Sequence, residues 1–191
     1  MEQNKEMTAS ESLQLISESF NRSRKDILRN SAKYFILWGV LLTATSLAIY
    51  LLWHFTGKPQ WNFPWFAMPV IGNPLAALIG KGHAAVPQNE VSKMLGGVWS
   101  VFGVFSITLS IIAVFLLPMR ITLMIVILLG LAECISGVLL KNWPIIIAGF
   151  LLGIGGAVFA LLVRSEAQLL IFTLGGILLL LTGFIMKIQY R

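Results

Sequence analysis

Residues 61–80, W-N-F-P-W-F-A-M-P-V-I-G-N-P-L-A-A-L-I-G, decide how many times this chain crosses a membrane. The stretch carries no charge, and its 20 residues match the length of a helix that crosses ~30 Å of hydrocarbon. It also contains Pro64, Pro69 and Pro74, and three prolines favour a loop or a re-entrant segment over a helix. Two layouts follow: six spans, or five spans plus a re-entrant segment.

The composition places the rest of the chain in a membrane as well. Of 191 residues, 57% are hydrophobic and 12% are charged, and the mean hydropathy is +0.85. A soluble domain has about 25% charged residues, and a disordered chain needs low hydrophobicity, so both classes are excluded. The net charge of +6 does not indicate nucleic-acid binding, because most basic residues stand singly between apolar runs.

Charged residues divide the remaining apolar sequence into five runs of about 20 residues each. The last four runs are joined by only two or three residues, which makes neighbouring helices antiparallel. The predicted spans are 34–53, 61–80, 94–117, 121–140, 143–163 and 167–186. We therefore predict an all-α integral membrane protein, with a transmembrane bundle over residues 34–191 and a cytoplasmic segment over residues 1–33.

The basic residues that flank the spans favour six spans over five. Lys and Arg are enriched on the cytoplasmic side of membrane helices. The five-span layout divides them seven against six, whereas the six-span layout divides them ten against three. The ten are Arg22, Arg24, Lys25, Arg29, Lys33, Lys81, Lys93, Lys141, Lys187 and Arg191, and the three are Lys58, Arg120 and Arg164. This predicts a protein of the cytoplasmic (inner) membrane with both termini in the cytoplasm.

The first two predicted spans resemble a known family. Residues 33–39, K-Y-F-I-L-W-G, and 50–72, Y-L-L-W-H-F-T-G-K-P-Q-W-N-F-P-W-F-A-M-P-V-I-G, are similar to the bacterial two-helix 2TM domain. The resemblance covers residues 33–83 and implies a first span, a short turn and a second span rich in Trp, Pro and Gly. His83 corresponds to a histidine often found after that second span, whereas Asn73-Pro74 departs from the Trp-Gly usual in the family. The family implies a topology and no activity.

The segment before the first span predicts an amphipathic helix from about residue 9 to residue 30. Thr8 and Glu11 form a capping-box pattern. Apolar residues then recur at helical spacing, and basic residues follow them: Leu13, Ile16, Phe20 and Ile27, then Arg22, Arg24, Lys25 and Arg29. On the cytoplasmic side, these bases would lie near anionic headgroups at the membrane surface. The helix either orients the chain or docks a partner.

Small residues are spaced so that they share one face of each span. The fifth span carries the most regular glycine zipper, Gly149, Gly153 and Gly156, and the fourth carries Gly130 and Gly137. Similar stripes are Gly39, Thr43 and Ser46; Gly96, Ser100 and Gly103; and Gly176 and Gly183. Helices in lipid associate through such residues, so we predict packing surfaces, with a pore lining as the alternative. A stripe left unused could join two copies of the chain or another membrane protein.

Glu133 is the one acidic residue inside a predicted span. A charge there costs about 2.5–3.5 kcal/mol on insertion scales, so we expect a neutral carboxyl group. One hypothesis makes it a hydrogen-bonding link between two helices. The other makes it a proton or cation site, with Ser100, Ser136 or Thr182 as its hydrogen-bonding partners.

The sequence contains no catalytic motif, and it predicts neither an enzyme, a metal site nor a cofactor. His54 and His83 fall on opposite sides of the six-span layout, and Cys134 lies within an apolar run. The predicted function is a non-catalytic scaffold, sensor or accessory subunit that binds protein or lipid partners. The alternative is a small proton- or cation-coupled transporter or channel centred on Glu133.

Overall fold

The computed structural model describes residues 9–81, 90–117 and 119–189, which are helical apart from short connections. Seven α-helices are present in these ranges: α1 (Ala9–Thr56), α2 (Pro64–Lys81), α3 (Glu90–Phe115), α4 (Ile121–Leu139), α5 (Trp143–Phe150), α6 (Gly156–Leu162) and α7 (Leu170–Gln189). Three short helical turns join them: η1 (Pro59–Asn62), the π-helical η2 (Leu151–Gly155) and η3 (Ser165–Leu169). Because η2 joins α5 to α6 without a break, these three elements form one segment.

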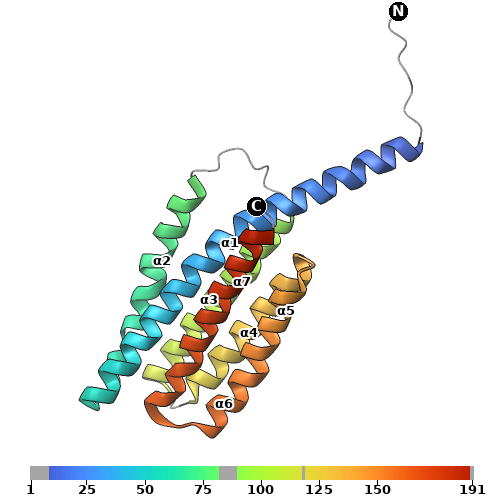
Figure 1. Cartoon of the computed structure of the whole chain (residues 1–191). Helices are drawn as coiled ribbons and strands as arrows, with labels where there is room; N and C mark the ends of the chain where they lie inside the picture. The colour runs from blue at the N-terminus through green and yellow to red at the C-terminus, as the bar shows by residue number, and fades with distance from the viewer. Residues whose placement is uncertain (1–8, 82–89, 118, 190–191) are drawn as a thin grey trace, which may run out of the picture.

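Six helical segments are long and apolar enough to cross a membrane, which confirms the predicted number of candidate spans. Successive segments run in opposite directions. The C-terminal end of α7 therefore lies at the end of the bundle where α1 enters it (Figure 1). Residues 61–80 fall largely in α2, which runs the length of the bundle beside α1 and is not a re-entrant loop (Figure 1).

The prolines that made residues 61–80 ambiguous are accommodated within α2. Pro64 is the first residue of the helix, where its missing N–H costs nothing, and Pro69 and Pro74 lie inside it. Between them, Gly72 faces the indole ring of Trp38 on α1, and a Cβ at Gly72 would lie 2.6 Å from a ring carbon. A larger residue at position 72 would therefore displace the Trp38 ring.

α1 is longer than the sequence predicted. The amphipathic segment and the first span were expected to be separate, but both belong to one helix of 48 residues. Such a helix is ~72 Å long, more than twice the ~30 Å of membrane hydrocarbon. Residues 30–34 contain neither Gly nor Pro, so nothing stops the helix there, and it ends before Gly57, which has a φ of 67°. Thr8 of the predicted capping box lies outside the described residues.

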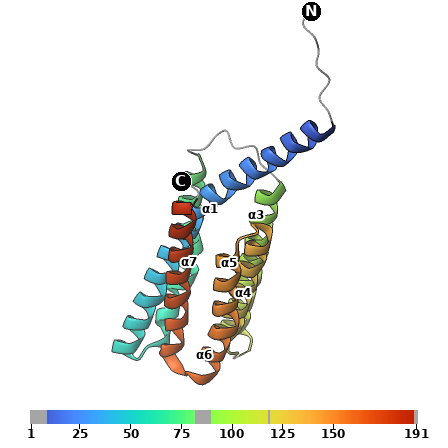
Figure 2. The ribbon, with the colours of Figure 1, turned by 45° about the vertical axis from the view of Figure 1, so that its right-hand side comes forward.

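Residues 9–25 of α1, called the α1 extension below, project from the bundle (Figures 1 and 2). The candidate span of this helix begins only at Asp26. Immediately after it, Ile27 and Leu28 are buried in the core, at 6% and 1% exposure. The extension is thus continuous with a segment that is firmly packed.

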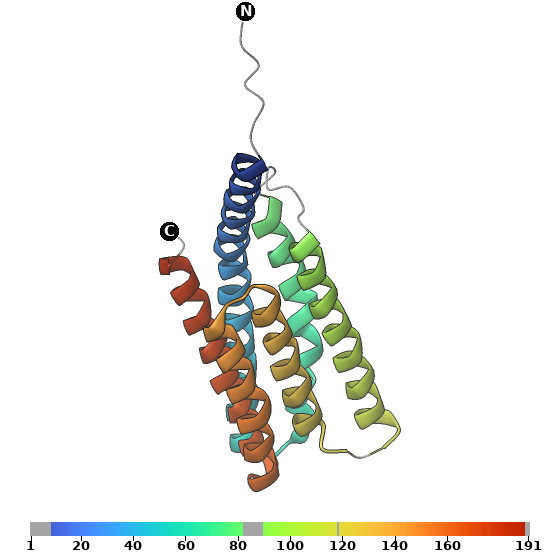
Figure 3. The same ribbon diagram turned by 90° about the vertical axis from the view of Figure 1, so that its right-hand side faces the viewer.

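Two pairs of helices form the core. α1 packs along α7, and α4 packs along the α5–η2–α6 segment. α2 rests mainly on α1, and α3 rests mainly on α4, so these two helices are peripheral. Figure 3 shows α7 and the α5–η2–α6 segment on one side of the bundle and α2 and α3 on the other.

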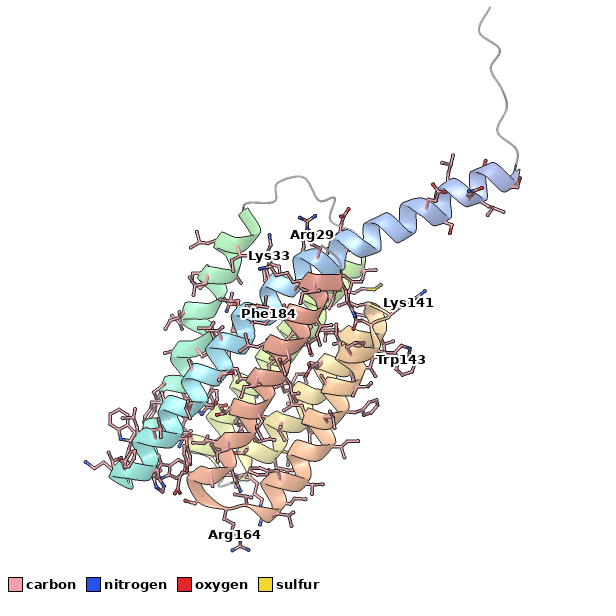
Figure 4. All side chains as sticks on the ribbon, viewed as in Figure 1. Arg29, Lys33, Lys141, Trp143, Arg164 and Phe184 are labelled. Atoms are coloured by element: carbon pink, nitrogen blue, oxygen red, sulfur yellow. The ribbon has the colours of Figure 1, made fainter. Side chains whose placement is uncertain are left out.

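Four of the basic residues used to choose six spans lie at the two ends of the bundle as that layout requires. Arg29, Lys33 and Lys141 lie at one end, and Arg164 lies at the other (Figure 4). Trp143 is 72% exposed beside Lys141, at a level where aromatic residues meet the membrane interface.

Candidate functional site

A close helix crossing joins α4 to the α5–η2–α6 segment. A Cβ added to Gly130 would collide with the Cα and N atoms of Gly153 and would lie 2.7 Å from the Gly149 carbonyl oxygen. One turn along, a Cβ on Gly149 would lie 2.6 Å from the Cys134 nitrogen and 2.8 Å from the Gly130 oxygen. The two backbones are therefore in direct contact, and only glycine fits at positions 130 and 149 without a shift of the backbone.

The other small residues predicted on these two spans also meet their neighbours. Gly137 faces Ile146 of α5, with 2.7 Å between its ideal Cβ and the Ile146 nitrogen. Gly156 faces Val126 of α4 and Ile171 of α7. Gly153 lies within η2, so the π-helical turn sits directly opposite Gly130. The sequence gives no local signal for this turn beyond its glycines.

A second close contact joins α1 to α7. A Cβ on Gly176 would collide with the Thr43 hydroxyl, and one on Gly39 would lie 2.8 Å from the Gly176 oxygen. Beside them, the hydroxyl groups of Ser46 and Thr173 are hydrogen-bonded at 2.7 Å, and both residues are buried. Thr173 was not singled out from the sequence, because its partner is 127 positions away.

The glycines in the small-residue stripe of α3 have open space beside them. A Cβ added to Gly96, Gly97 or Gly103 would find no atom within 4 Å. Ser100, predicted as a possible hydrogen-bonding partner of Glu133, is exposed and donates to the Gly96 carbonyl at 2.8 Å. Ser106 lies further along α3 and has a buried hydroxyl without a partner among the described residues.

Glu133 is fully buried on α4, at 0% exposure. Neither carboxyl oxygen has a hydrogen-bond partner among the described residues. Glu133 lies three residues after Gly130 and four before Gly137, so it borders the α4–α5 crossing. It is 12 residues from the start of α4 and six from its end, or ~18 Å and ~9 Å by helix rise.

The three expected partners of Glu133 do not bond to it. The Ser136 hydroxyl is buried and donates to the Ala132 carbonyl on its own helix at 2.7 Å. Ser100 bonds within α3, and Thr182 is buried on α7 without reaching either Glu133 oxygen. Within the described part of the chain, Glu133 therefore makes no hydrogen bond between helices.

A polar contact that the sequence missed lies at the bundle end that carries Arg164. His54, at the end of α1, approaches Glu166 of η3 at 3.2 Å between Nδ1 and Oε1. The His54 ring also stacks on Tyr50, one turn earlier. Because 112 positions separate the two partners, no sequence spacing could have paired them. His83 lies outside the described residues.

The basic cluster near the amino terminus is described only in part. Arg29 is exposed at its end of the bundle (Figure 4). The side chains of Arg22, Arg24 and Lys25 are not among those described. Leu13 and Leu15 of the α1 extension are 68% and 51% exposed, so these apolar side chains have no cover from the bundle.

The described residues contain no group of three or more His, Cys, Asp or Glu side chains that could hold a metal ion. Comparison with known proteins adds no identity: no family model, curated protein or solved structure matches the chain.

Proposed function

We propose that this chain is a non-catalytic membrane scaffold, sensor or accessory subunit that binds protein or lipid partners through the α1 extension. The observation that carries the proposal is the exposure of Leu13 and Leu15 on a helix that continues into the core. Removal of apolar surface from water is favourable by about 25 cal/mol per Å², so burial of these leucines against another surface would be favourable. Because the α1 extension lies outside the hydrocarbon, the surface that buries these leucines must belong to the membrane interface or to another protein.

The charges of the extension support its position on the cytoplasmic side of the membrane. Its basic residues Arg22, Arg24 and Lys25 stand between the exposed leucines and the candidate span. Basic residues next to a membrane span favour the side of the membrane that carries anionic lipids. We therefore place the extension in the cytoplasm, on the inner membrane, with the carboxyl terminus on the same side.

Photo-crosslinking of the full-length chain tests the role of the extension. A photoreactive amino acid at Leu13 should form adducts with lipid, or with one protein that recurs between preparations, because this position needs cover. Glu18 provides a polar control on the same helix, since it is exposed and lies about 140° around the helix axis from Leu13. Equal labelling at the two positions, or none at either, would contradict the proposal.

A truncation separates anchoring from binding, and the structure fixes its end point. Deletion of residues 1–25 removes the extension and keeps Ile27 and Leu28, which are buried in the core. The shortened chain should insert and fold as before but lose whatever the Leu13 position captured. A partner that co-purifies unchanged with the shortened chain would show that the bundle binds it instead.

A further inference from the structure

Glu133 has a buried carboxyl group that the proposed scaffold role does not require. A carboxyl group that links helices must donate or accept a hydrogen bond, and neither Glu133 oxygen has a partner among the described residues. An unsatisfied buried polar group costs about 1–3 kcal/mol. Helix packing therefore gains nothing from a carboxyl group here that glutamine or leucine would not provide.

The surroundings of Glu133 determine which ligand it can hold. A divalent cation needs six or more oxygen ligands, or a set of nitrogen and sulfur ligands. The described residues provide no cluster of metal-binding side chains, and the nearby Ser136 hydroxyl is already bonded to the Ala132 carbonyl. A proton needs only the carboxylate itself, and it also removes the charge that the bundle interior disfavours.

Few other ionisable groups lie on the elements that pack most extensively against α4, which are α3, α5, η2 and α6. The segment Trp143–Leu162 has none, and α3 has only Glu90 and Lys93, in its first turn. On α4 itself, the neighbouring residue Cys134 is the only other ionisable group. Protonation of Glu133 is therefore set by its burial and by how the helices around it pack.

The segment that packs on α4 at Gly130 and Gly137 contains an irregular turn. η2 is π-helical over Leu151–Gly155, and its Gly153 touches Gly130, one turn from Glu133. Turns of this kind occur frequently at functional sites within helices. Glycine-to-glycine contact leaves no side chain between the two backbones, so a change in this turn would move α4 at Gly130, one turn from Glu133.

We infer that Glu133 is a proton-binding site inside the bundle, at the α4–α5 crossing, and that it exchanges its proton with the aqueous phase. This site goes beyond the scaffold role, and its loss would leave the α1 extension and its partners intact. A carboxyl group differs from an amide of the same shape in its ability to release a proton, and this ability is what the site would use.

Two measurements on the purified full-length protein test the inference. Dicyclohexylcarbodiimide, an apolar reagent, adds to protonated carboxyl groups in apolar surroundings and leaves a stable N-acylurea. Peptide mapping should find this adduct on Glu133 after treatment in mild acid, whereas a water-soluble carbodiimide should modify Glu166 and spare Glu133. Absence of the apolar adduct from Glu133 in the folded protein would overturn the inference.

Infrared difference spectra between mildly acidic and mildly alkaline samples test exchange directly. The carbonyl stretch of a protonated carboxyl group should be lost on alkalinisation and should return on acidification, in the parent and in Glu133→Asp. Glu133→Gln should lack this change while keeping the helical signal of the parent. A carboxyl band that persists unchanged in alkali would identify a permanently protonated, structural group and would also overturn the inference.

Discussion

Replacement of Gly149 by alanine tests whether the α4–α5 crossing holds the bundle together. The new Cβ would lie 2.6 Å from the Cys134 nitrogen, 2.7 Å from its sulfur and 2.8 Å from the Gly130 oxygen. Carbon–oxygen contacts between neighbouring helices are ~3.3 Å or longer, so the backbones would have to separate by about 0.5 Å or more. Two of the three obstructing atoms belong to the backbone and cannot rotate away.

The expected cost follows from two opposing effects. Overpacking of a tight interior costs ~1–3 kcal/mol, and the immovable backbone places Gly149→Ala at the upper end of that range. Alanine favours the helix over glycine by ~1 kcal/mol, which leaves a net loss of about 2 kcal/mol. Gly97→Ala on α3 is the matched control, because its Cβ would meet no atom within 4 Å and should raise stability by up to ~1 kcal/mol.

Equilibrium unfolding by a denaturing detergent in mixed micelles, followed by tryptophan fluorescence, measures both variants. Gly149→Ala should unfold at a lower fraction of denaturing detergent than the parent, and Gly97→Ala at the same fraction or a higher one. If the two variants shift together, or if Gly149→Ala is as stable as the parent, the close crossing does not stabilise the bundle.

Three further outcomes are expected. Ser46→Ala leaves the buried Thr173 hydroxyl unpaired and should lower the unfolding free energy by about 0.6–2 kcal/mol, and a cycle with Thr173→Val and the double variant should give a coupling energy above zero. In a Cys134→Ala background, a single cysteine at Arg164 should react with a membrane-impermeant reagent from outside intact cells, and one at Lys187 only after the cells are opened; the reverse order would invert the proposed orientation. Gly176→Ala should loosen the α1–α7 contact, because its Cβ would lie 2.9 Å from the Gly39 oxygen and would press on Thr43, so that disulfide cross-linking between cysteines placed on these helices becomes slower than in the parent.

The sequence predicts the spans well because lipid imposes a simple rule on them. Charged residues must lie at or beyond the ends of a membrane helix, so the positions of Lys141 and Arg164 set the limits of the fifth span to within a residue or two. The excess of Lys and Arg on one side then identified residues 61–80 as a span in spite of three prolines. Neither rule showed that α1 is continuous from residue 9, because the change from polar to apolar sequence near residue 30 does not end a helix that lacks a stop signal.

The contacts of the candidate site could not be predicted, since helical spacing shows which residues share a face but not what that face meets. Gly130 and Gly96 belong to similar stripes, yet Gly130 touches another backbone and Gly96 has open space beside it. Ser136 is close to Glu133 in sequence, but a serine in a helix can bond to the carbonyl four residues earlier, and Ser136 does so. The rotation of each helix about its axis settles such choices, and it depends on all its neighbours together.

Of the proposed roles, a sensor is favoured by the packing of α1 along α7. The α1 extension continues, without a break, into the segment that carries Leu28 and Ser46. Leu28 is 1% exposed in the core, and Ser46 is hydrogen-bonded to Thr173 on α7. A helix transmits a tilt or rotation along its length, so a partner that moved the extension would also strain its contacts with α7. This differs from a surface helix joined by a flexible linker, which could bind a partner without any effect on the bundle. If the extension serves only as an anchor, cross-linking between α1 and α7 should proceed at the same rate with and without residues 1–25.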